Sequence, residues 1–149
     1  SRSALLDKLT TGGFNRRFQP VKTGCEWITS DEEIAASYGR DPLRCFRFTV
    51  NAYDNMFVSI GEAQSARRMK GIPKSLPLLL ISGECDPVGG FGKGVRAAYA
   101  RYQAAGLQQV RCLLYPGCRH ELLNEVDRET VYADLLDWMN AHMAAGQKG

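Results

Sequence analysis

The sequence has no long hydrophobic run and no dense cluster of charge. The longest apolar run, residues 76–81, is interrupted by Pro77, whereas a membrane-spanning helix requires about 20 apolar residues. The N-terminus lacks the apolar stretch of a signal peptide. The net charge is only +3, and the lysines and arginines are scattered, so a nucleic-acid-binding surface is not expected. These absences favour a cytoplasmic protein with no transmembrane segment and no nucleic-acid partner.

The usual patterns of metal ligands are also absent. There are only two histidines, and no Cys-x-x-Cys pair occurs, so the common zinc-ligand spacings are excluded. The number of cysteines is odd, which favours thiols in a reducing cytosol over a disulfide framework. The cysteines are Cys25, Cys45, Cys85, Cys112 and Cys118. We expect neither a metal nor an organic cofactor.

An initiator methionine is missing as well, because the sequence begins Ser1-Arg2-Ser3. This start indicates an excised, processed or proteolytic piece of a longer protein. The length of 149 residues fits one ordinary domain. The character of the sequence changes near residue 71. Residues 1–70 are predicted to be mainly helical, and residues 71–149 are predicted to alternate strands and helices.

In the first part, residues 3–9 and 49–69 show helical character. A third helix is predicted to open at Ser30, because Ser30-Asp31-Glu32-Glu33 has the pattern of a capping box in which the serine hydroxyl binds the Glu33 amide. This helix should end near Gly39, before Pro42.

In the second part, residues 77–82 are apolar without alternation, which is typical of a parallel strand buried on both faces. Residues 92–105 are predicted to form a crossover helix, residues 109–115 a second strand and residues 121–143 a final helix. The apolar stripe expected on the final helix comprises Val126, Thr130, Ala133, Leu135, Leu136, Trp138 and Met143.

The turns that follow the two strands contain the best candidates for catalytic residues. Asp86 follows the first strand, and His120 follows the second. Carboxyl ends of parallel strands joined by one crossover helix lie at the same edge of a sheet, so the two side chains should lie near each other. A carboxylate can orient an imidazole that acts as a general base. Taken singly, Asp86 is as readily a turn residue and His120 a structural histidine. His142 is expected to lie on the surface.

A matching nucleophile is absent from the sequence. The serines stand at positions 1, 3, 30, 37, 59, 65, 75 and 82, and none lies in Gly-x-Ser-x-Gly. Cys85 and Cys118 neighbour Asp86 and His120, but a reactive thiol needs an electropositive, partly exposed setting. A cysteine nucleophile is therefore a minor alternative. The glycine-rich residues 89–94 do not match a phosphate-binding loop.

The segments Gly83-Glu84-Cys85-Asp86-Pro87-Val88 and Tyr115-Pro116-Gly117-Cys118-Arg119-His120-Glu121 resemble the C-terminal region of α/β-hydrolases of the lysophospholipase, monoacylglycerol lipase and serine aminopeptidase-like group. The resemblance spans residues 76–138. It implies that Asp86 is the triad acid and His120 the triad base of a carboxylic-ester hydrolase that needs no cofactor. Residues 1–70 are more loosely similar to the helical cap of this group. The resemblance then makes residues 71–149 a segment of the hydrolase core.

The resemblance implies that the strands and the serine of the N-terminal half are missing from this sequence. We therefore expect a fragment that acts on a lipid-like ester together with its missing half, or that self-associates through an exposed sheet edge. Apolar residues of the cap that are candidates for an acyl-chain pocket are Phe46, Phe48, Tyr53, Met56 and Phe57. Two alternatives stay open: a non-catalytic interaction module, and a related hydrolase or acyltransferase that acts on another acyl substrate.

Overall fold

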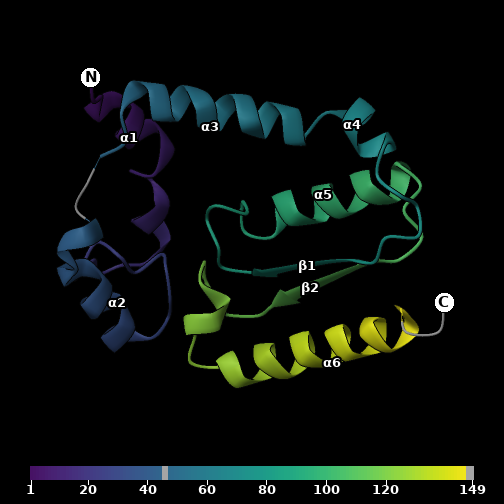
Figure 1. Cartoon of the computed structure of the whole chain (residues 1–149). Helices are drawn as coiled ribbons and strands as arrows, with labels where there is room; N and C mark the ends of the chain where they lie inside the picture. Colours follow the sequence, from purple (N-terminus) through teal and green to yellow (C-terminus); the bar gives the residue numbers. More distant parts are fainter. Residues whose placement is uncertain (45–46, 147–149) are drawn as a thin grey trace.

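The computed structural model describes residues 1–44 and 47–146 (Figure 1). The first part of the chain contains helices α1 (Ala4–Thr10), α2 (Glu32–Arg40), α3 (Val50–Ala63) and α4 (Ala66–Lys70), with 3-10 turns at Phe14–Arg17 and Pro42–Arg44. The second part contains β1 (Leu78–Gly83), α5 (Lys93–Ala104), β2 (Val110–Tyr115), a 3-10 turn at Leu122–Asn124 and α6 (Arg128–Gly146).

Strands β1 and β2 form a parallel pair connected by α5. The register runs from Leu78 opposite Val110 to Gly83 opposite Tyr115. Helices α5 and α6 lie on opposite faces of the pair (Figure 1). This βαβ arrangement, covered by helices on both faces, confirms the α/β class predicted from the alternating pattern.

The main buried cluster lies between the two strands and α6. Its buried members are Tyr115, Cys118, Leu122 and Val131, and partly buried Ile81, Leu113 and Leu135 pack against them. The β1 residues Leu78 to Ile81 are only partly buried, so the prediction of a strand buried on both faces is wrong for this segment. Within the described residues only two strands are present, and such a narrow sheet cannot enclose its own strands.

The final helix differs from the prediction in its start and its buried face. It begins at Arg128, because the residues before it form a separate 3-10 turn at Leu122–Asn124. The Glu121 amide, at the start of this turn, donates to the Ile28 carbonyl. Val131 is fully buried, whereas Leu136 and Met143 are 55% and 67% exposed. The predicted stripe is therefore displaced around the helix.

Two expectations in the first part also need correction. The helix predicted over residues 49–69 is divided into α3 and α4, because Ser65 adopts an extended backbone between them. Helix α2 is capped by Asp31, whose side chain accepts hydrogen bonds from the Glu33 and Ile34 amides. Ser30 is not the cap, because its hydroxyl binds the Glu125 carboxylate instead.

The first part is held together by a few specific contacts. Arg2 and Thr49 form an isolated antiparallel bridge, and the buried Tyr53 hydroxyl donates to Asp7 at 2.5 Å. None of the described helices is long and apolar enough to cross a membrane. The division into a cap at residues 1–70 and a core segment at residues 71–149 stays a prediction.

Candidate functional site

The loops after β1 and β2 bring Asp86 and His120 into contact. The His120 Nδ1 atom lies 3.3 Å from both carboxylate oxygens of Asp86. The parallel register brings the two strand ends together, since Gly83 lies opposite Tyr115 at the end of the pair. An imidazole held by a carboxylate in this way can act as a general base toward a nucleophile.

Asp86 is held by backbone groups of its own loop. The Val88 amide donates to Asp86 Oδ1 at 2.8 Å, and the Phe91 amide donates to the Asp86 carbonyl at 2.8 Å. The residue is only 7% exposed. Burial alone would raise the pKa of the Asp86 carboxyl, but hydrogen bonds from His120 and from the Val88 amide outweigh it, so the pKa lies below its ordinary value. Asp86 is therefore an anion at neutral pH.

His120 is more open than its partner. Its side chain is 37% exposed, and the Trp27 ring lies against it with the ring centroids 5.1 Å apart. The hydrogen bond to Asp86 raises the pKa of the imidazole, burial opposes this rise, and the charges of Asp86 and Glu121 add to it. The net pKa is above the ordinary value, which favours the protonated imidazole.

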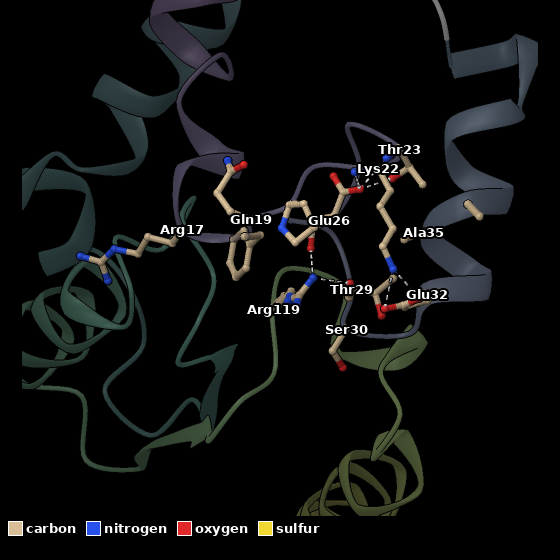
Figure 2. A pocket seen from close by; sticks show the side chains of 13 residues that line it. Arg17, Gln19, Lys22, Thr23, Glu26, Thr29, Ser30, Glu32, Ala35 and Arg119 are labelled. Atoms are coloured by element: carbon tan, nitrogen blue, oxygen red, sulfur yellow. Dashed lines mark hydrogen bonds and ion pairs between the residues drawn. The ribbon is translucent and has the colours of Figure 1, made fainter.

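The His120 loop is attached to residues 26–30 of the first part. The Arg119 guanidinium donates to the carbonyls of Glu26 and Thr29 (Figure 2). The guanidinium carbon of Arg119, Cζ, also lies 4.4 Å from the centre of the Phe18 ring. On the other side of His120, the Glu121 amide donates to the Ile28 carbonyl at 2.7 Å. These contacts fix the backbone on both sides of the histidine.

Gly83 lies where the loop after β1 comes closest to the loop after β2. A Cβ atom at this position would lie 2.2 Å from the carbonyl oxygens of both Cys118 and Arg119. The Cys85 amide donates to the same Cys118 carbonyl at 2.9 Å. Close approach of the two loops therefore requires glycine here, for reasons of space.

Two pockets lie next to residues that contact His120 or adjoin it in sequence. One, of about 460 Å³, includes Arg119, Glu26 and Thr29 in its wall (Figure 2), but neither Asp86 nor His120 lines it. The other, of about 540 Å³, is lined in part by Trp27, the residue that contacts His120.

The predicted acyl-pocket residues are placed differently from one another. Phe48 and Tyr53 line the pocket beside Trp27 together with charged side chains of Asp7, Arg44 and Arg47. Met56 and Phe57 do not line this pocket, and Phe57 is 47% exposed. Phe46 lies outside the described residues.

The other candidates for chemistry are less favourable. Cys118 is 5% exposed, and burial, followed by the charges of Glu125 and Asp127, raises the pKa of its thiol, which argues against a nucleophilic role. His142, which was expected on the surface, is half-buried and packs against Trp138 with the ring centroids 4.4 Å apart. In the part of the chain that the structure describes, no three His, Cys, Asp or Glu residues form a group suited to a metal ion.

Sequence reasoning did not assign a role to several residues around His120. These residues are Trp27, Arg119 and Glu125, and of the three only Arg119 lies within the two segments that resemble the family. Their contacts join positions about 90 residues apart in sequence. A single sequence contains no periodic pattern that reports such long-range side-chain contacts.

Comparison with known proteins identifies relatives that share this architecture. The profile of the family described as serine aminopeptidase, S33, matches residues 4–127. A monoacylglycerol lipase of Mycolicibacterium smegmatis (strain ATCC 700084 / mc(2)155) is 25% identical over 119 residues, which cover 78% of this chain and 39% of that protein.

Solved structures agree. A highly thermostable carboxyl esterase from Bacillus coagulans, in complex with glycerol, has a TM-score of 0.76 and 29% identity, with 93% of this chain and 45% of that chain covered. A lipase in its open form has a TM-score of 0.81 and 27% identity, with 94% of this chain and 46% of that chain covered. The chain spans less than half the length of each of these three relatives. It belongs to the serine aminopeptidase S33 family of α/β-hydrolases.

Proposed function

We propose that this chain supplies the acid and the base of a serine hydrolase that cleaves carboxylic esters. In this proposal His120 is the general base, Asp86 orients it, and the nucleophilic serine comes from a segment outside residues 1–149. The observation that carries the proposal is the contact of His120 Nδ1 with both Asp86 oxygens at 3.3 Å, at the carboxyl edge of a parallel strand pair. Membership of the serine aminopeptidase S33 family, and similarity to a carboxyl esterase and to a lipase, support the same chemistry.

The geometry supports a division of roles between the two imidazole nitrogens. Nδ1–H donates to the ionised Asp86, which fixes the tautomer that leaves Nε2 with a lone pair. Nε2 then takes the proton of the serine hydroxyl as the oxygen attacks the ester carbonyl. The same nitrogen returns this proton to the departing alcohol, and the cycle repeats with water to release the acid.

The environment of His120 favours the charged form that arises during the reaction. Asp86 is an anion in contact with the ring, and its hydrogen bond raises the pKa of the imidazole. The Asp86 carboxylate would therefore stabilise the imidazolium next to the tetrahedral intermediate.

For the substrate, we propose a lipid-like ester of the monoacylglycerol or lysophospholipid type. The support is the similarity to a protein named monoacylglycerol lipase and to an esterase solved in complex with glycerol. We further propose that residues 1–70 form the cap over the site. Phe48 and Tyr53 of this region line the pocket that Trp27 connects to His120.

Steady-state hydrolysis of 4-nitrophenyl butyrate and of a monoacylglycerol, by the protein that carries this sequence and its nucleophile segment, tests the proposal. His120→Ala should lower kcat/KM by about 10⁴-fold or more, because loss of a triad member removes proton transfer. The matched control is His142→Ala, which should retain activity because His142 packs on Trp138.

Full activity of His120→Ala would overturn the assignment. A folded protein with no esterase activity before mutation would also overturn it and would favour the alternative of a non-catalytic interaction module. Circular dichroism and thermal unfolding of each variant separate loss of chemistry from loss of folding.

A further inference from the structure

The most deeply buried carboxylate of the described residues belongs to Glu125, which is 0% exposed and plays no part in the proton transfer proposed above. We propose that Glu125 is a positioning residue that fixes the backbone of His120 and links it to the start of α2. This inference rests on the proposed role of His120 as general base.

The Glu125 carboxylate is shared between the two parts of the chain. One oxygen, Oε1, accepts a hydrogen bond of 2.5 Å from the amide of Arg119, the residue directly before His120. The other, Oε2, accepts the Ser30 amide at 3.0 Å and also the Ser30 hydroxyl. Ser30 directly precedes Asp31, the N-cap of α2. One buried side chain therefore connects the histidine loop to the entry of a helix 95 residues away in sequence.

Neighbouring bonds show that this carboxylate closes a network. The Thr29 hydroxyl donates to the Asn124 carbonyl at 2.7 Å, and the Arg119 guanidinium donates back to the Thr29 carbonyl at 3.0 Å. The Arg128 side chain donates to the Glu125 carbonyl at 3.1 Å and thereby fixes the backbone of Glu125.

The chemistry explains why a carboxylate suits this position. A buried anion is costly unless several donors satisfy it, and here two backbone amides and one hydroxyl point at the two oxygens. Glutamine keeps the shape but brings an NH₂ group toward these donors, so at least one amide loses its acceptor. The Arg119 amide is one of the two at risk, and its release lets the backbone before His120 move.

A small movement at this point has a large expected consequence. The contact between His120 and Asp86 is already 3.3 Å long, and a displacement of about 1 Å in a catalytic group lowers a rate about 10²-fold. Substrate binding is not expected to change to the same degree, because the Glu125 side chain is 0% exposed and thus out of reach of a substrate.

The test compares Glu125→Gln with Glu129→Gln, an exposed glutamate on the first turn of α6. Both are made in the protein with its nucleophile segment. For Glu125→Gln we expect kcat to fall about 10²-fold with KM changed less than about threefold. We also expect the His120 pKa, followed by NMR of ¹⁵N-labelled histidine, to fall toward its ordinary value because the contact with Asp86 weakens. Glu129→Gln should match the parent in all three quantities.

The inference is wrong if folded Glu125→Gln keeps the parent's kcat and His120 pKa, or if its activity falls only in proportion to the folded fraction. Should Glu125→Gln fail to fold, Ser30→Ala removes one bond to the same carboxylate. Ser30→Ala should lower both kcat and the His120 pKa, and parent values in that variant would overturn the inference. Failure of the proposed function is recognised separately, by an active His120→Ala.

Discussion

The two loops of the site are built in different ways. The Asp86 loop is held mainly by amides of its own residues, as in the bonds from Val88 and Phe91 to Asp86. The His120 loop is held mainly by residues 26–30, through Arg119, Glu121 and Glu125. Asp86 is therefore placed by local backbone geometry, whereas His120 depends on a segment 93 residues away in sequence.

This difference has a consequence for how the site responds to change. Perturbation of residues 26–30 should affect the histidine and leave the aspartate in place. If residues 1–70 form a cap, the cap takes part in positioning the base as well as in covering the site.

Asp86→Asn should give the largest effect. Asparagine keeps the size of the side chain, but its amide can hold the imidazole in the wrong tautomer, so kcat should fall on the order of 10⁴-fold. Asp137→Asn, an exposed change on α6, is the matched control. Ester hydrolysis at a fixed pH measures both, and an Asp86→Asn protein within tenfold of the parent would contradict the role of Asp86.

Arg119→Met should have an intermediate effect. The methionine keeps much of the packing against Phe18 but removes the bonds to the Glu26 and Thr29 carbonyls. The His120 loop should loosen, with kcat lowered about 10²-fold and a lower unfolding temperature.

The control for this change lies beside the Asp86 loop. Arg96 pairs with Glu84 at 3.3 Å, and both side chains are largely exposed, so Arg96→Met should change stability and activity little. Equal effects of Arg96→Met and Arg119→Met would refute the contrast between the two loops.

Gly83→Ala should push apart the Asp86 loop and the His120 loop where they lie closest. The added methyl would lie 2.2 Å from two carbonyl oxygens, so the backbone must shift, and we expect a loss of about 1–3 kcal/mol in the free energy of unfolding. Gly61→Ala in α3, where no atom lies within 4 Å of the new carbon, should instead stabilise by about 0.5–1 kcal/mol. Chemical denaturation measures both. A neutral Gly83→Ala would show that the loops are not tightly packed.

The smallest effect concerns pH. The raised pKa of His120 means that its contact with Asp86 contributes most to stability below the ordinary histidine pKa, and the contribution is lost as pH rises through the folded-state value. The lowered pKa of Asp86 means that its contribution is lost as pH falls through the folded-state value of that carboxyl. The base must be neutral to act, so kcat/KM should rise over the same pH range in which the histidine contribution to stability declines. An acidic limb at or below about pH 6.5 would contradict this expectation.

The sequence was sufficient for the βαβ unit but not for its surroundings. Apolar residues 77–82 and 109–115 predicted both strands, because hydrophobic runs bounded by turns are a local property. The loops after them predicted where Asp86 and His120 lie, because parallel strands end at one edge. The buried face of the final helix was less predictable, because Val131 is buried and Leu136 is exposed although both are apolar residues of that helix.

Capping and polar networks were not predictable for a related reason. Ser30 and Asp31 are both good N-cap residues, and the outcome depends on the Glu125 carboxylate, which takes the Ser30 hydroxyl. Likewise Arg119 and Trp27 acquire roles only through residues distant in sequence. Such contacts follow from tertiary packing, about which composition and periodicity of one sequence contain little information.

The most direct test of the central claim is the rate at which a fluorophosphonate probe labels the protein that carries this sequence, with the labelled residue identified by mass spectrometry. We expect the label on a serine outside residues 1–149, and we expect His120→Ala to slow labelling by several orders of magnitude. Labelling of a residue within this sequence, or an unchanged rate in His120→Ala, would contradict that claim.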